Sequence, residues 1–153
     1  PRASTPAKRL EAVRQLTEAG IPVSVLASPI IPALNDHELE RILEAAHAAG
    51  ATTASYILLR LPLEVSPLFR DWLLRNYPDR YRHVMSLIRS MRGGKDYDAE
   101  FGKRMKGDGP YAWQISRRFE IAAKRLGLGR RGIALRDDLF VPPAGGGVQL
   151  SLL

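Results

Sequence analysis

The stretch that decides the fold reads IPVSVLASPIIPALN, at residues 21–35. Its first part, residues 21–27, is a short apolar and β-branched run, which predicts a strand buried on both faces, as in a parallel sheet. Two prolines, Pro29 and Pro32, then remove backbone donors and disfavour helical geometry in the residues before them. The stretch therefore predicts a buried strand that ends in a loop at residues 28–34.

Amphipathic helices are predicted on both sides of this stretch. Residues 5–20 begin with Thr-Pro, an N-cap followed by proline, and their apolar residues recur at helical spacing. Asn35 or Asp36 is expected to cap a second helix that ends at Gly50. A second strand is predicted at residues 54–59. Helix, strand, helix and strand with short connections is the order of βα units, which build a parallel sheet or a β/α barrel.

From residue 64 onward the pattern becomes helical. Helices are predicted to begin at Ser66-Pro67, at Pro78 and at Pro110. A run of proline and glycine near the C-terminus predicts a flexible tether. The predicted fold class is α/β, with three parts: the last two βα units of a partial parallel β/α barrel at 1–63, a basic, mainly helical extension at 64–141, and a flexible tail at 142–153.

The chain of 153 residues has no cysteine and a net charge of +7. Without thiols it can form no disulfide, no thiolate zinc site and no thiolate-held iron–sulfur cluster, and because its three histidines are scattered we assign no metal. No stretch is long and apolar enough to span a membrane, and no signal peptide is recognisable, so we expect a cytoplasmic protein with no membrane partner. The chain begins at Pro1 and soon enters a helix, from which we expect the C-terminal half of a larger enzyme.

The positive charge is concentrated in the second part of the chain. Residues 1–60 hold six Lys or Arg and six Asp or Glu, whereas residues 61–153 hold seventeen and ten. Such an excess commonly marks an anionic partner, nucleic acid above all, while a generically basic protein is the alternative. The candidate phosphate contacts are Arg70, Arg75, Arg80, Arg82, Arg89, Arg92, Lys103, Arg104 and Lys106.

Several motifs, taken in order and spacing, resemble one enzyme family. They are SPIIPALND at residues 28–36, YILLRLPLE at residues 56–64, RGGK at residues 92–95, FG at residues 101–102 and GDGP at residues 107–110. Together they resemble radical S-adenosylmethionine enzymes, in the group related to spore photoproduct lyase that is described as DNA-repair-photolyase-like. The likeness covers roughly residues 2–127.

This resemblance implies a partial barrel of six βα units in which the strands seen here are the fifth and sixth. The missing N-terminal half of the barrel would hold a [4Fe-4S] cluster through a Cys-x3-Cys-x2-Cys loop. The parent enzyme would cleave S-adenosylmethionine reductively to a 5′-deoxyadenosyl radical, with damaged nucleic acid as a candidate substrate. This chain alone would then be inactive, with neither cofactor bound.

The resemblance also implies site residues. The family's motif Gly-x-Ile-x-Gly-x-x-Glu packs against the adenine of S-adenosylmethionine, and its four positions fall on Ser28, Ile30, Pro32 and Asn35, of which only Ile30 is identical. A rigid turn ahead of a capped helix is the alternative explanation of these residues. Arg60 and Glu64 follow the second strand, where barrel enzymes place substrate contacts, and an ordinary solvated loop pair is the alternative there.

The last five residues, QLSLL at residues 149–153, resemble the peptide Gln-Leu-Ser/Asp-Leu-Phe by which bacterial repair proteins and polymerases dock on the sliding clamp. Leucine replaces the final phenylalanine. Gln149 would form hydrogen bonds with the clamp, and Leu150, Leu152 and Leu153 would fill an apolar pocket. A tail that covers an apolar patch of its own fold is the alternative. A basic nucleic-acid-binding or DNA-repair interaction module is accordingly the second functional hypothesis beside the enzyme.

Overall fold

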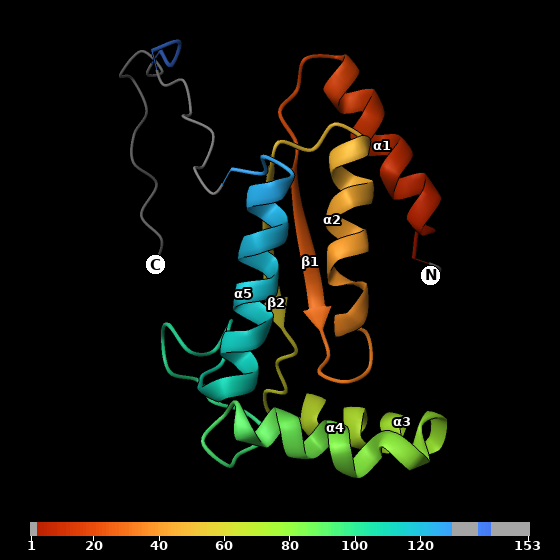
Figure 1. Ribbon diagram of the computed structural model, residues 1–153, viewed down its shortest axis with the longest axis vertical. Coiled ribbons are helices and arrows are strands. Elements are labelled where there is room, and N and C mark those ends of the chain that lie inside the picture. The colour runs from red at the N-terminus through yellow and green to blue at the C-terminus, as the bar shows by residue number, and fades with distance from the viewer. Residues whose placement is uncertain (1–2, 130–137, 142–153) are drawn as a thin grey trace, which may run out of the picture.

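The computed structural model describes residues 3–129 and 138–141. Within these ranges the chain forms a mixed α/β fold in which a small parallel sheet is packed with α-helices (Figure 1). The elements in chain order are α1 (Pro6–Glu18), β1 (Ser24–Ile30), the 3-10 helix η1 (Asp36–Glu38), α2 (Leu39–Ala48), β2 (Thr53–Leu58), α3 (Val65–Asn76), α4 (Pro78–Ser90) and α5 (Gly109–Arg125).

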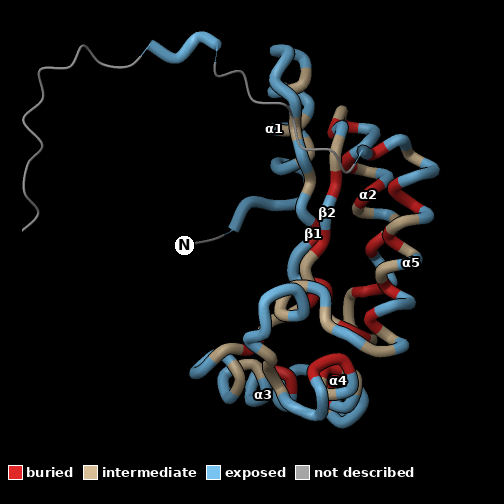
Figure 2. Tube along the Cα trace, turned by 90° about the vertical axis from the view of Figure 1, so that its left-hand side faces the viewer, coloured by how far each residue is buried: buried red, intermediate tan, exposed pale blue. Residues whose placement is uncertain are grey.

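The strands β1 and β2 run parallel, which confirms the pairing predicted from the βα order. The register starts with Ser24 opposite Thr53 and continues to Ala27 opposite Tyr56, with an irregularity before Ile30. The helices α2 and α5 lie side by side on one face of this sheet (Figure 2). In β2 the alternate residues Ala54, Tyr56 and Leu58 are buried, because successive residues of a strand face opposite sides. In β1 the buried residues are Ala27 and Ile30, on either side of the irregularity.

The prediction that β1 is buried on both faces was wrong. Its intervening residues face away from the helices, and Leu26 keeps 52% of its surface exposed. The predicted end of the strand was also wrong, because β1 continues through Pro29 to Ile30. A proline is tolerated there since β1 is an edge strand among the described residues, and an edge strand has backbone groups that need no partner in the sheet.

The core joins elements that lie far apart in the sequence. The rings of Tyr56 in β2 and Phe119 in α5 are 4.9 Å apart at their centres, and both side chains are 1% exposed. Beyond α5 the chain returns to the sheet, where the Gly129 N–H donates to the Thr52 carbonyl at 3.1 Å. A helix from the predicted extension therefore closes the core of the two strands, and the boundary at residue 63 stays a prediction.

The helix α1 is attached at one end and buries none of its residues. Thr5 caps it as predicted, accepting a hydrogen bond from the Lys8 N–H at 3.3 Å. Its contact with the end of α2 is made by Thr17, whose hydroxyl donates to the Gly50 carbonyl at 3.3 Å. Gly50 has φ of +106°, and a Cβ there would lie 2.7 Å from Thr17 Cγ2. The apolar residue Leu16 remains 42% exposed, so the apolar side of α1 is only partly covered.

The helices α3 and α4 pack against each other across the ends of the strands (Figure 1). Their starts agree with the predicted Ser66-Pro67 and Pro78 to within one residue. They enclose a second apolar cluster that also takes in the loop after β1, made of Leu61, Leu73, Val84, Met85 and Ile88 with Ile31, Ala33 and Leu34 against it. None of the described helices is long and apolar enough to cross a membrane.

The aromatic contact in the core yields a first prediction. Phe119→Ala removes a fully buried ring and should lower the free energy of unfolding by about 3–5 kcal/mol. Urea denaturation followed by circular dichroism measures this loss. Ile121→Ala is the matched control on the same helix, since Ile121 is 61% exposed and its replacement should change stability by less than about 1 kcal/mol. Similar losses in the two variants would contradict the described packing of α5.

Candidate functional site

The loops that follow the two parallel strands meet at one edge of the sheet. The Leu59 N–H, just after β2, donates to the Ile30 carbonyl at the end of β1 at 2.8 Å. In α/β folds this carboxyl edge is where ligands bind, because the loops there are free to vary while the strands hold them in place. We therefore take the carboxyl ends of β1 and β2 as the candidate site.

The loop after β1 is held together by Asn35. Its side-chain oxygen accepts from the Ile31 N–H at 2.7 Å, and its amide nitrogen donates to the Pro29 carbonyl at 3.0 Å. No side-chain hydrogen bond from Asn35 caps the following helix η1. The expectation that Asn35 or Asp36 caps the second helix was wrong, because Glu38 holds the cap position of α2 and the Asn35 amide bonds to the loop that precedes it.

The four positions aligned with the adenine motif do not form an adenosine contact by themselves. Ile30 is 1% exposed and packs in the core cluster, and Pro32 is also buried. Both ends of the Asn35 amide are already bonded within the loop. Only Ser28 presents an exposed side chain, on β1. The side chains of this chain alone thus do not fit S-adenosylmethionine at these positions.

A polar network that was not predicted from the sequence connects the start of α2 to α5. The Tyr111 hydroxyl donates to Asp36 Oδ2 at 2.6 Å, and Asp36 is 6% exposed. Arg118 binds both carboxylate oxygens of Glu40, at 2.7 and 2.6 Å, and also the Asp36 carbonyl at 2.9 Å. The only signal in the sequence is that Tyr111 and Arg118 are seven residues apart and so share a helix face. The network fixes the loop after β1 against α5.

This network shifts the pKa of two of its members. The hydrogen bond from Arg118 holds the pKa of Glu40 below its ordinary value. Burial, together with the hydrogen bond to Asp36 and its charge, raises the pKa of Tyr111 to about 12. At neutral pH these shifts keep Glu40 a carboxylate, which accepts from Arg118, and keep Tyr111 a neutral phenol, which donates to Asp36.

The side chain of Arg92, which follows α4 in the chain, is buried at the end of β2. It is 2% exposed, and its guanidinium donates to the Lys103 carbonyl at 2.8 Å and to the Leu59 carbonyl at 3.1 Å. Burial lowers the pKa of Arg92, and the charge of Arg60 contributes in the same direction. This position ties the segment around residue 103 to the end of β2, so Arg92 is not one of the surface contacts expected for nucleic acid.

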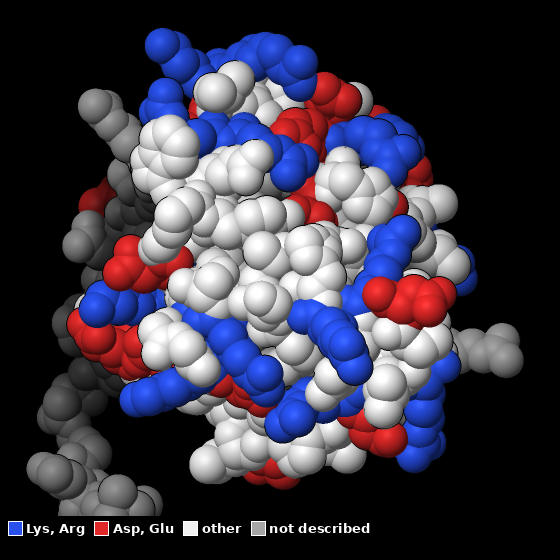
Figure 3. Space-filling model, turned by 60° about the horizontal axis from the view of Figure 1, so that its bottom comes forward, with Lys and Arg blue, Asp and Glu red and all other residues white. Residues whose placement is uncertain are grey.

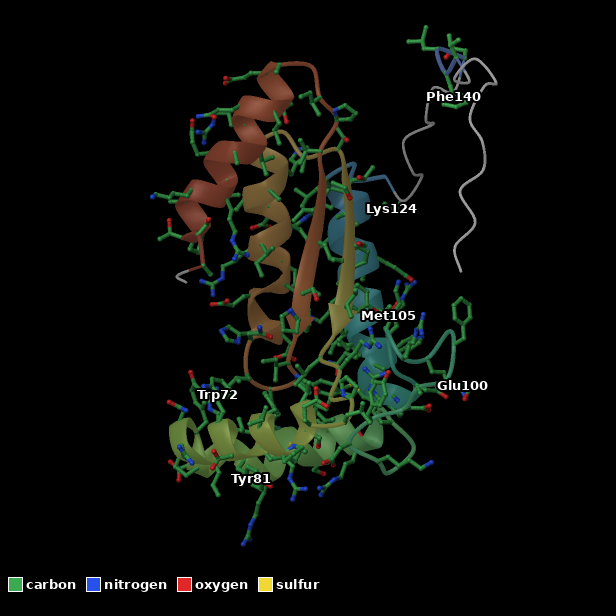
Figure 4. The ribbon with its side chains drawn as sticks, turned by 180° about the vertical axis from the view of Figure 1, so that it is seen from behind. Trp72, Tyr81, Glu100, Met105, Lys124 and Phe140 are labelled. Carbon is green, nitrogen blue, oxygen red and sulfur yellow. The ribbon has the colours of Figure 1, made fainter. Side chains whose placement is uncertain are left out.

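Arg60 lies next to this buried arginine. Its Nη2 donates to the Tyr97 hydroxyl at 3.0 Å, and its Nη1 is 3.8 Å from Met105 Sδ. Figure 4 shows Met105 close to the end of β2. Glu64, the other expected substrate contact, is exposed at the start of α3, and no described contact joins it to Arg60.

At Gly107 the segment of residues 103–108 packs closely against the end of β2 and the residue that follows α4. A Cβ on Gly107 would lie 3.1 Å from the Met91 carbonyl oxygen and 3.3 Å from Leu58 Cδ1, and its φ is +67°. The Leu58 N–H donates to the Met105 carbonyl at 2.9 Å. Gly107, the first glycine of the motif GDGP at residues 107–110, therefore lets this segment pack against β2 and the end of α4, where a larger residue would not fit.

The remaining basic candidates fall into two groups. Arg70 and Arg89 share Asp96, Arg75 pairs with Asp71 and Lys103 with Glu100, so these four already have acidic partners. The others have no acidic partner among the described ion pairs: Arg80, Arg82, Arg104 and Lys106. Figure 3 shows that basic and acidic side chains are interspersed around the end of the molecule that α3 and α4 form.

The expected clamp contacts at residues 149–153 lie outside the described residues.

Comparisons with known proteins give relatives without an assigned role. Uncharacterized proteins of Mycobacterium bovis and of two Mycobacterium tuberculosis strains are each 33% identical to this chain over 85 residues, which cover 52% of this chain and 25% of the relative. The chain thus spans about a quarter of the length of the curated relatives it matches. No family model and no solved structure matches it.

The Tyr111 hydroxyl provides a second prediction. Because Tyr111 is protonated more strongly in the folded than in the unfolded state, its contribution to stability is fully present below about pH 10 and is lost as the pH rises through about 12. Urea unfolding at pH 8 to 12 should therefore show a smaller difference between the wild type and Tyr111→Phe at high pH. At pH 8 we expect the variant to be less stable by about 1–2 kcal/mol. A pH-independent difference would contradict the bond to Asp36.

Proposed function

We propose that this chain supplies the last βα units of a partial parallel β/α barrel in a radical S-adenosylmethionine enzyme of the cytoplasm. The observation that carries the proposal is a two-stranded parallel sheet with one face left open. Among the described residues β1 pairs only with β2, and beside β1 lies an open groove of about 740 Å³ lined by α1, β1 and α2. Parallel strands are found almost only in sheets whose faces are both covered, and here one face exposes Leu26.

A further βα unit would satisfy these features together. A strand beside β1 would use its unpaired backbone edge, and its helix would cover the apolar residues of the groove, among them Leu10, Val13 and Ile42. The helix α1, which has no buried residue within this chain, would then be covered by the added βα unit. This arrangement supports the barrel proposal over a sheet that ends at β1, which would leave Leu26 and the groove open to water.

The cofactors of the proposed parent would be held outside this chain. A [4Fe-4S] cluster needs thiolates, and the sequence has no cysteine. The side chains at the adenine positions do not fit S-adenosylmethionine on their own, as described above. The part we propose for this chain is therefore structural support of the barrel and a surface for the substrate at the carboxyl ends of its strands.

The third prediction concerns the parent protein. Its coding sequence upstream of Pro1 should contain a Cys-x3-Cys-x2-Cys motif, and the protein reconstituted without oxygen should form 5′-deoxyadenosine from S-adenosylmethionine when reduced. Chromatography of the quenched reaction measures the product. A parent without the cysteine motif, or one that holds the cluster but forms no 5′-deoxyadenosine, would end the proposal.

A matched pair of variants tests the barrel in the same parent. Leu26→Asp should lower the free energy of unfolding of the parent by about 2–4 kcal/mol, because an added strand and helix would bury residue 26. Leu68→Asp on α3, where the leucine is 66% exposed, should change it by less than about 1 kcal/mol. Equal effects would show that the face around Leu26 stays open to solvent.

A second function is favoured by the basic residues that have no acidic partner. Arg80 and Arg82 lie on α4, while Arg104 and Lys106 lie in the segment beside β2. Arg80 donates to the Ala33 carbonyl at 3.4 Å, and Arg104 and Lys106 lie over aromatic rings, but none of these contacts neutralises the charge. The charge of Arg75, by contrast, is paired with Asp71 at 2.8 Å. We propose that a nucleic-acid substrate or partner would be contacted by these four residues, and that the clamp-like tail would belong to this repair function.

The fourth prediction is the salt dependence of that binding. Four phosphate contacts should weaken the affinity for double-stranded DNA by about a hundredfold between 50 and 200 mM salt. Fluorescence anisotropy with a labelled duplex measures it. Arg82→Gln should reduce the slope of log affinity against log salt concentration by about 1, the contribution of one phosphate contact. Arg75→Gln should reduce this slope less, since Arg75 is already paired with Asp71. A flat salt response would exclude this second function.

A further inference from the structure

We propose that Arg60 binds an anionic group of a ligand, a phosphate or a carboxylate, at the carboxyl end of β2, with the buried guanidinium of Arg92 beside it. The inference deepens the proposed function by naming the chemical class of the substrate. It depends on that function only for the identity of the ligand, because the site itself is built from contacts within this chain.

The hydrogen-bonding groups of Arg60 are largely unused. A guanidinium carries five N–H donors, and a partly buried one normally places them on oxygen acceptors. Here one donor reaches the Tyr97 hydroxyl at 3.0 Å and another only the weakly accepting Met105 sulfur at 3.8 Å. The Nε of Arg60 is buried and has no hydrogen-bond partner. Buried donors without acceptors are costly, so Arg60 is short of acceptors among the described residues.

The second observation is that no described carboxylate bonds directly to either guanidinium of the pair. Arg92 bonds only to the neutral carbonyls of Lys103 and Leu59, and no described carboxylate forms an ion pair with Arg60 or Arg92. Asp98 is close enough to favour the charged form of Arg92, yet not close enough for an ion pair. A buried positive charge is ordinarily paired directly, and Arg60 and Arg92 have no such direct pair among the described residues.

The contrast with a neighbouring pair of arginines supports the argument. Arg70 and Arg89 also lie at the α3 and α4 end of the molecule, and Asp96 neutralises both, with Arg89 Nε at 2.7 Å and Arg70 Nη1 at 3.6 Å. Asp96 is further held by the Ser66 hydroxyl at 3.0 Å. Arg60 and Arg92 have no such internal acid among the described residues, which indicates that their anion comes from a ligand.

The position of Arg60 suits a ligand contact. It follows Leu59, whose backbone joins β2 to the end of β1 and also accepts from Arg92, so the strand holds Arg60 in a fixed place. Its side chain is half-buried and therefore reaches solvent while it is partly shielded from it. Partial shielding strengthens the attraction between opposite charges, because the local dielectric is lower than that of water.

The test measures binding of inorganic phosphate to the intact protein in chloride buffer by isothermal titration calorimetry. We expect saturable binding that is at least tenfold weaker in Arg60→Gln. Arg117→Gln, which removes the same charge from an exposed site on α5, should bind within about twofold of the wild type. Circular dichroism verifies the fold of each variant, and Arg60→Lys serves in its place if the glutamine variant is unfolded. It keeps the charge but loses the planar fork, so we expect severalfold weaker binding.

Two further probes separate the sources of the anion. A 5′-phosphorylated thymidine dinucleotide that binds more tightly than phosphate, with the same dependence on Arg60, would identify a nucleic-acid phosphate. Succinate that binds more tightly than phosphate would identify a carboxylate ligand. Saturable binding of none of the three, or equal losses in Arg60→Gln and Arg117→Gln, would overturn the proposal. Because no probe needs a cluster or S-adenosylmethionine, failure here is distinct from failure to form 5′-deoxyadenosine.

Discussion

The contact between Tyr56 of β2 and Phe119 of α5 is the interaction on which the rest of the described structure depends. Two parallel strands alone bury too little surface to be stable, so the sheet exists because α2 and α5 cover one of its faces. The aromatic pair, with ring centres 4.9 Å apart, lies in the middle of that layer. Since α5 arrives only after α3 and α4, these helices form an insertion between β2 and its covering helix, and they close the carboxyl ends of the strands.

Local elements of this fold could be predicted from the sequence. Proline at the first turn of a helix needs no hydrogen-bond donor, and Pro6, Pro78 and Pro110 accordingly mark three helix starts. The short connections of the first two βα units predicted the parallel pairing. The burial of β1 could not be predicted, because an apolar run does not tell which of its faces a neighbouring element will cover.

The position of the candidate site could be predicted from the sequence, but the contacts of its residues could not. Arg60 was singled out because it follows a parallel strand, and the structure puts it at the carboxyl edge as that rule requires. Its partners Tyr97 and Met105 are more than thirty residues away, and no local pattern marks them. Arg92 was expected among the phosphate contacts because of the basic second part of the chain, whereas the carbonyls of Lys103 and Leu59 hold it inside.

Two unsatisfied features remain, and they are of different physical kinds. In the proposed barrel a polypeptide would cover the face around Leu26, which is 52% exposed, whereas in the proposed site an anion would bind at Arg60. In a β/α barrel the two requirements are coupled, because the strands that cover the open face also enclose the space above their carboxyl ends. Enclosure would lower the dielectric around Arg60 and strengthen its hold on an anion. Completion of the sheet would therefore turn a partly exposed arginine into a selective substrate contact.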